Sequence, residues 1–254
     1  MENIKNNAIY LERMEKGIAD KLFFLEFLDD DITTVVDFGC ANAALGKAIQ
    51  ILRPDLEYVG FDNNHTMLME ARQNLPNAKF FEKLDPIITY IKNKKAILVL
   101  SSVIHEVYSY SDKEWIEYFW DFVRYSGFAQ VSIRDMGLSN RTIAFMAPDE
   151  EFLPIIKAYL LGKYNSNKDY TYFFQYYQMW LKYWYQENWE RESNENYFSI
   201  TTEEIKEIFA ECKHTIVHES HFIVPWVENK VIQDFGINPF KYSTHYEMVL
   251  KLDK

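Results

Sequence analysis

Strand-like and helix-like segments alternate strictly in this sequence from residue 33 to residue 134, with short connections between them. Five apolar runs have the length and composition of buried strands: 33–38, 57–61, 79–84, 96–101 and 128–134. Helical patterns separate them at 43–52, 67–75, 87–91 and 111–125. Because right-handed crossovers place helices on both faces of a parallel sheet, this order predicts an α/β fold with a Rossmann-like, mostly parallel sheet.

The flanking segments extend this pattern. An amphipathic helix is expected over 9–28, and two runs at 214–224 and 242–252, joined by an irregular segment, predict an antiparallel pair at one edge. The sheet would then have seven strands. Capping boxes at Ser111–Glu114 and Thr201–Glu204 predict the starts of two helices.

Residues 137–199 form an insertion that is too long for a loop and is rich in Tyr, Trp and Phe. We expect a helical cap over one end of the sheet, with 1–136 and 200–254 forming the core. Its aromatic residues would either build the hydrophobic core of the cap or stack on a planar or cationic ligand. Within it, Arg191 and Glu195 are spaced as a helical ion pair, which is commonly a surface feature.

Composition excludes several classes of protein. The formal charge of −11 provides no global positive field, so nucleic acid would need a local basic patch. Two cysteines are too few for a disulfide framework and favour a reducing compartment. The longest apolar run, 96–104, is far shorter than the ~20 residues of a membrane span. We therefore expect a cytoplasmic protein with no membrane partner; the sequence leaves its oligomeric state open.

The turn after the first expected strand is the natural ligand site, because open parallel sheets bind ligands beyond the carboxyl ends of their strands. Gly39, Ala41 and Ala43 in this turn are small enough to let a ligand approach the backbone. Asp37 precedes them, and Asp62 ends the second strand 25 residues later. An acid at the position of Asp62 accepts hydrogen bonds from ribose hydroxyls, or alternatively fixes a turn or caps a helix.

Three segments carry a resemblance to a known family. Residues 35–43 resemble the first motif of the class I S-adenosylmethionine-dependent methyltransferases, D-x-G-x-G-x-G, and 58–62 resemble the second. Residues 97–106 are similar to the fourth-strand segment of many members, which ends in a stretch containing histidine. The resemblance covers 33–134 and not the cap. Ala41 and Ala43 stand where the family prefers glycine, and each would be strained in a left-handed conformation.

The resemblance implies S-adenosylmethionine as the cofactor. It assigns cofactor contacts to eight residues: Asp37, Gly39, Cys40 and Ala41 in the turn, Asp62 at the ribose, Asn63 beside it, Asp85 at the adenine, and Ser101 after the fourth strand. Asp85 is equally well placed to cap the helix that begins near Pro86.

His105 and Glu106 follow the fourth strand, where the acceptor should meet the methyl group. His105 would act as a base that ionises near pH 6–7, or would simply pack and fix the loop. Glu106 would contact the substrate or remain a solvated charge. No metal is expected, because His214, His218 and His221 alternate between the faces of a strand.

The implied activity is methyl transfer to an oxygen or nitrogen of a small molecule or of a single exposed group. Neither D/N-P-P-Y/F nor a Pro-Cys pair occurs, which disfavours DNA amino-methylation and cysteine-dependent pyrimidine methylation. Three alternatives remain: an RNA or other nucleic-acid methyltransferase, a nicotinamide-dependent oxidoreductase, and a non-catalytic binding protein with the same fold.

Overall fold

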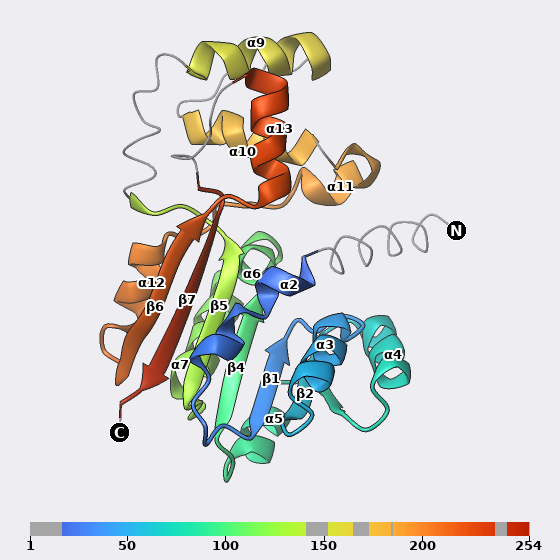
Figure 1. Ribbon diagram of the computed structural model, residues 1–254, viewed down its shortest axis with the longest axis vertical. Helices are drawn as coiled ribbons and strands as arrows, with labels where there is room; N and C mark the ends of the chain where they lie inside the picture. The colour runs from blue at the N-terminus through green and yellow to red at the C-terminus, as the bar shows by residue number, and fades with distance from the viewer. Residues whose placement is uncertain (1–16, 141–151, 165–172, 184, 237–242, 254) are drawn as a thin grey trace.

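A computed structural model of the chain describes residues 17–140, 152–164, 173–183, 185–236 and 243–253. Its centre is a seven-stranded sheet in the order β3-β2-β1-β4-β5-β7-β6 (Figure 1). The strands are β1 Thr34–Phe38, β2 Glu57–Phe61, β3 Lys79–Phe81, β4 Ala96–Ser101, β5 Gln130–Met136, β6 His214–Phe222 and β7 His245–Leu252. β1 to β5 pair in parallel and β7 runs antiparallel to β5 and β6, which confirms the expected fold class.

Helices cover both faces of the sheet. They are α3 Ala44–Leu52, α4 His65–Asn74, α5 Asp85–Ile91, α6 Ile104–Tyr110, α7 Lys113–Tyr125 and α12 Thr202–Phe209. Because side chains alternate along a strand, β4 reaches both layers. Leu98 and Leu100 pack into the cluster that contains α5, α7 and α12 residues, whereas Ile97 and Val99 pack into the cluster formed with α3 and α4.

The leading helix differs from the prediction. Residues 9–16 lie outside the described ranges, and the remainder divides into α2, Ile18–Lys21, and a 3₁₀ helix, η1, Phe23–Phe27. A continuous helix through residue 28 is therefore wrong. Phe24 is fully buried in the cluster formed with α3 and α4, and Lys21 is buried, with 6% of its surface exposed.

One of the two expected capping boxes is present. The Thr201 side chain accepts from the Glu204 backbone, and the Glu204 carboxylate accepts from the Thr201 backbone. The box at Ser111 is wrong, because α6 occupies the preceding residues and Ser111 ends it. Asp112 caps α7 instead by accepting from the backbone N–H of Trp115 at 2.8 Å.

The cap draws on two separate parts of the chain. The insertion supplies α9 Phe152–Tyr164, α10 Phe173–Tyr183, η2 Gln186–Asn188 and α11 Trp189–Glu192. A further helix, α13 Pro225–Phe235, lies between β6 and β7, where an irregular connection was expected. Pro225 in its first turn and Gly236 with φ +70° at its end are the start and stop signals that the sequence analysis missed.

Aromatic side chains of the insertion form the cap's hydrophobic core. Tyr177 and Trp180 of α10 are completely buried and stack with ring centroids 5.6 Å apart. Val231 and Phe235 of α13 join the same cluster, and α13 stands beside α9 and α10 above the sheet (Figure 1). No helix within the described ranges is both long and apolar enough to span a membrane.

Candidate functional site

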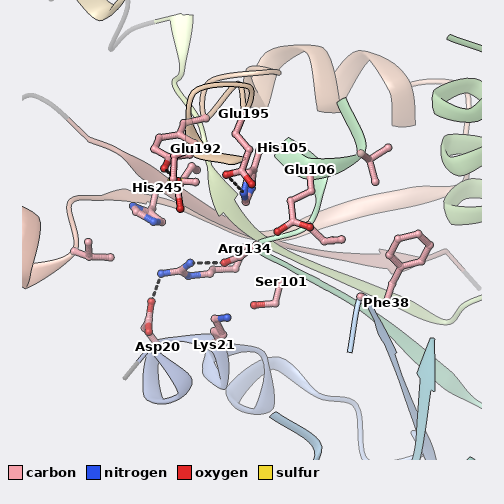
Figure 2. Close-up of a pocket in the computed structure, with 18 of the residues that line it drawn as sticks. Asp20, Lys21, Phe38, Ser101, His105, Glu106, Arg134, Glu192, Glu195 and His245 are labelled. Atoms are coloured by element: carbon pink, nitrogen blue, oxygen red, sulfur yellow. Dashed lines mark hydrogen bonds and ion pairs between the residues drawn. The ribbon is translucent and has the colours of Figure 1, made fainter. Parts of the chain in front are cut away.

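A cavity of about 880 Å³ lies beyond the carboxyl ends of the parallel strands, between the sheet and the cap. Six of the sequence-predicted site residues line it: Gly39, Asp62, Asn63, Ser101, His105 and Glu106. Figure 2 shows Lys21 and Arg134 facing Glu195 and Glu106 across this cavity. The structure therefore brings four of the predicted cofactor residues and both predicted catalytic residues to one cavity.

The turn after β1 is built from left-handed residues. Gly39 has φ +76°, and Ala41 and Ala43 have φ +45° and +61°. Left-handed backbone costs an alanine roughly 1–2 kcal/mol, so both alanines carry the strain that glycine would avoid. A Cβ on Gly39 would lie 2.8 Å from Cγ2 of Val103, so packing as well as ligand access requires glycine there.

Asp62 ties this turn to the second strand. Its Oδ2 accepts a hydrogen bond from the Ala41 backbone at 2.9 Å, and its Oδ1 accepts one from the Asn64 backbone at 2.8 Å. Burial raises the pKa of Asp62, and these two hydrogen bonds oppose that effect. A carboxylate oxygen accepts more than one hydrogen bond, so Asp62 can fix the turn and still bind hydroxyls from the cavity.

The other predicted cofactor residues do not line the large cavity. Asp37, Cys40 and Ala41 are buried, and Asp37 accepts a hydrogen bond from the Tyr58 hydroxyl at 2.5 Å. Burial raises the pKa of Asp37 to about 6. Asp37 and Cys40 border a much smaller pocket shared with Lys21 and Ser101.

Asp85 is exposed and lies outside both pockets. It is the first residue of α5 and accepts a hydrogen bond from the Tyr118 hydroxyl at 2.8 Å. Its alternative role as the helix cap is wrong, because Leu84 occupies the capping position and no side chain caps this helix.

His105 is held by a buried carboxylate from the neighbouring strand. Its Nδ1 lies 2.5 Å from Oδ1 of Asp135, whose Oδ2 accepts from the backbone N–H groups of Val103 and Ile104 at the start of α6. Burial alone would lower the pKa of His105, but the charge and hydrogen bond of Asp135 outweigh it and raise the pKa to about 9. The expected ionisation near pH 6–7 is therefore wrong: His105 is an imidazolium at neutral pH.

Glu106 and Glu195 share one arginine. The Arg191 guanidinium pairs with Glu106, and its Nε lies 2.6 Å from Oε1 of Glu195. Glu195 is only 4% exposed, and its Oε2 is 4.0 Å from Nε2 of His105. The interpretation of Arg191 and Glu195 as a surface pair is therefore wrong. Burial raises the pKa of Glu106 in spite of the charge on Arg191.

Two buried cations near the turn were missed. Lys21 makes no hydrogen bond or ion pair with any described residue, and its pKa is lowered by burial and by the charge on Arg134. Arg134 pairs with Asp20 and donates to the Ser102 hydroxyl at 2.8 Å. A signal was available in the sequence, because Arg134 is a charged residue at the end of the expected buried strand 128–134.

A third missed residue is His245, the first residue of β7, which also lines the cavity. The three histidines at 214, 218 and 221 lie on β6, and none of them borders the cavity. Over the described ranges, no three His, Cys, Asp or Glu side chains are grouped closely enough to hold a metal ion.

Comparison with models of protein families and with curated protein sequences gives no match. Solved structures are similar in fold. The plantazolicin methyltransferase BamL, in complex with a triazolic desmethylPZN analog and SAH, has a TM-score of 0.58 at 13% identity over 100% of this chain and 92% of that chain. A SAM-dependent methyltransferase from Archaeoglobus fulgidus has a TM-score of 0.55 at 12% identity over 93% of this chain and 94% of that one.

A second plantazolicin methyltransferase, BpumL, has a TM-score of 0.51 at 12% identity and covers 99% of this chain and 89% of its own. At such identities the likeness establishes the fold. The chain has the fold of class I SAM-dependent methyltransferases, as the resemblance of its motifs implied.

Proposed function

We propose that this protein is an enzyme that transfers a methyl group from S-adenosylmethionine to a small molecule or to a single exposed group of a larger one. The observation that carries the proposal is the meeting of the turn after β1, the Asp62 carboxylate and a large cavity at the carboxyl edge of the sheet. Structures with the same fold include methyltransferases, two of them with SAH bound.

The proposed cofactor site follows from the side chains along this edge. Asp62 accepts from the ribose hydroxyls and Asn63 lies beside them. Gly39 contacts the methionine part, and the buried Cys40 and Ala41 hold the shape of the turn behind it. Asp37 lies behind the turn and favours the cofactor's amino group through its charge rather than by direct contact.

Lys21 and Ser101 suit the cofactor's carboxylate. Both are at least nine-tenths buried at the cavity, and the Ser101 hydroxyl has no hydrogen-bond partner among the described residues. A buried cation and a buried hydroxyl without partners are costly, and a carboxylate would satisfy both. Asp85, exposed on α5, has no comparable support for an adenine contact.

The acceptor would bind on the cap side, beside His105 and Glu106. Methyl transfer is an in-line displacement, so holding the acceptor in line with the sulfonium supplies much of the rate. Aromatic rings of the cap, including those of Tyr185 and Tyr197, line this side. The carboxylates of Glu106, Glu192 and Glu195 disfavour a polyanion there, which favours a small molecule over nucleic acid.

We further propose that residues 137–199 form a cap inserted in a core of 1–136 and 200–254, with α13 of the core contributing to the cap, and that the enzyme acts in the cytoplasm. Calorimetric titration with S-adenosylmethionine and S-adenosylhomocysteine tests the cofactor. We expect one saturable site for both and no binding of NAD. Binding of NAD alone, or of neither methionine derivative, would contradict the proposal.

Activity on acceptor pools tests the remaining alternatives. Tritiated methyl groups should pass from S-adenosylmethionine to a low-molecular-weight metabolite extract and not to RNA. Transfer to RNA would favour the nucleic-acid alternative, and cofactor binding without any transfer would favour a non-catalytic binding protein.

A further inference from the structure

His245 presents a polar nitrogen to the cavity that no described residue satisfies. Its ring is 8% exposed and stacks on Phe222, with centroids 5.7 Å apart. Nδ1 lies 2.8 Å from the Thr244 hydroxyl oxygen, whereas Nε2 has no hydrogen-bond partner in the described ranges. Figure 2 shows the ring at the cavity, between Arg134 and Glu192. Nε2 is not among the buried side-chain atoms that lack a partner, so it is accessible from the cavity, and a polar group of a ligand can pair with it there.

The surroundings of His245 keep its ring neutral. Burial, and then the charges of Arg134 on β5, His105 on α6 and Lys21 on α2, lower the pKa of His245 well below its ordinary value. Carboxylates line the same cavity from both sides: Asp20, Asp62 and Glu106 belong to the core, and Glu192 and Glu195 belong to the cap. His105 is in the opposite situation, because Asp135 holds it as an imidazolium.

We propose that Nε2 of His245 contacts the methyl acceptor and takes its proton, and that the accepting group is a hydroxyl. The proposal rests on the proposed function. In the step, an electron pair of the hydroxyl oxygen forms the bond to the methyl carbon as the carbon–sulfur bond breaks. The pair of that bond remains on sulfur and yields a neutral thioether. The hydroxyl proton passes to Nε2, and the resulting imidazolium later releases it to water.

The low basicity of His245 favours a hydroxyl over an amine. A hydroxyl proton becomes strongly acidic as the oxygen–carbon bond forms, so a weak base in contact with it is sufficient. A neutral amine needs no base during transfer, and an ammonium group would require a stronger base than this histidine. The tautomer that serves the step has its proton on Nδ1, donated to the Thr244 hydroxyl.

Nuclear magnetic resonance of the full chain, labelled with ¹⁵N and ¹³C in histidine and saturated with S-adenosylhomocysteine, tests the protonation state. His245→Gln assigns the signal. We expect an unprotonated Nε2 and a protonated Nδ1 at about pH 7, with His105 doubly protonated in the same sample. A proton on Nε2 of His245 at that pH overturns the proposal. Failure of S-adenosylhomocysteine to bind would instead contradict the proposed function.

Transfer of tritiated methyl groups to the low-molecular-weight extract tests the role in the reaction. His245→Ala should lower transfer at least ~100-fold while changing the affinity for S-adenosylhomocysteine by less than about threefold. Added imidazole should restore part of the activity, which a purely structural role would not allow. The exposed His65 provides the control, His65→Gln, with unchanged transfer.

Two results in this assay would overturn the proposal. One is His245→Ala retaining more than about half of the wild-type transfer; the other is label found on nitrogen rather than oxygen in the product. Absence of transfer by the wild-type protein in spite of cofactor binding would contradict both this proposal and the proposed function.

Discussion

The two ends of the cavity are built in different ways. At the turn end, the motif residues come from β1, β2 and the segments after them, all within 37–63, and are joined by Lys21 of α2 and Ser101 of β4. At the cap end, the side chains of His105, Asp135, Arg191, Glu195 and His245 come from four distant segments. Residues that belong to a local motif can therefore be recognised in a single sequence, whereas residues that long-range packing brings together can be identified only from the fold.

The largest loss of stability is expected when the cap end loses its buried carboxylate, Asp135. Asp135→Ala removes the fully buried partner of His105 and the acceptor of backbone N–H groups at the start of α6. Breaking a buried pair by removing one member typically costs about 3–5 kcal/mol. We expect a loss of this size in the free energy of unfolding, measured by urea denaturation at pH 7. Asp135→Asn keeps an oxygen acceptor and should lose clearly less; equal losses would mean that charge alone matters.

The second prediction concerns the pH dependence of the same pair. The folded-state pKa of His105, about 9, lies above the ordinary value of 6.5, which corresponds to about 3 kcal/mol. This stabilisation is complete below about pH 6.5 and is lost as the pH rises through about 9. His105→Gln should therefore destabilise the protein strongly at pH 6 and much less at pH 9.5.

Urea denaturation of His105→Gln and of wild type at both pH values measures this difference. The exposed His65 offers a matched control, because His65→Gln should change little at either pH. A penalty for His105→Gln that stays constant between pH 6 and 9.5 would show that His105 is neutral in the folded protein.

The third prediction tests the turn end. Asp62→Ala should weaken the binding of S-adenosylhomocysteine at least about tenfold, because charge-assisted hydrogen bonds to the ribose contribute about 1.5–3 kcal/mol. Calorimetric titration measures the affinity, with Asp30→Ala, at an exposed residue outside both pockets, as the control. Equal affinities for Asp62→Ala and wild type would remove Asp62 from the cofactor site.

The smallest effect is expected on the stability of the turn end, at Ala41. Ala41→Gly should raise the free energy of unfolding by about 1 kcal/mol, because glycine adopts φ +45° without steric cost. Ala48→Gly, within α3, should lower it by about 0.5–1 kcal/mol. Thermal unfolding of the two variants compares them directly, and destabilisation by both would show that the turn tolerates alanine without strain.

The sequence was sufficient for the seven strands of the sheet and for most of the helices that cover it, and it predicted a ligand site at the edge of the sheet where the cavity lies. Buried parallel strands and crossover helices are determined by local patterns, as are the turn at Gly39 and the acid at position 62. The start of α7 at Asp112 was missed because a second helix, α6, ends at the residue before it. α13 was missed because its Pro225 was interpreted as part of an irregular connection.

The protonation states of the histidines in the site could not be predicted from local sequence patterns. His105 looks like an ordinary histidine in sequence, and its pKa is set by Asp135, 30 residues later and on another strand. His245 is separated by more than 100 residues from each of the cations that surround it. Such values depend on burial and on distant charges together, so they require the folded structure.

The position of α13 links the cap mechanically to the edge of the sheet. This helix interrupts the β6–β7 hairpin and packs its Val231 and Phe235 among the buried rings of α10. Local opening of the cap must therefore detach α13 and pull on the beginning of β7. In hydrogen exchange, the amides of α10, of α13 and of the residues near His245 should behave as one cooperative unit, with protection lost together rather than helix by helix.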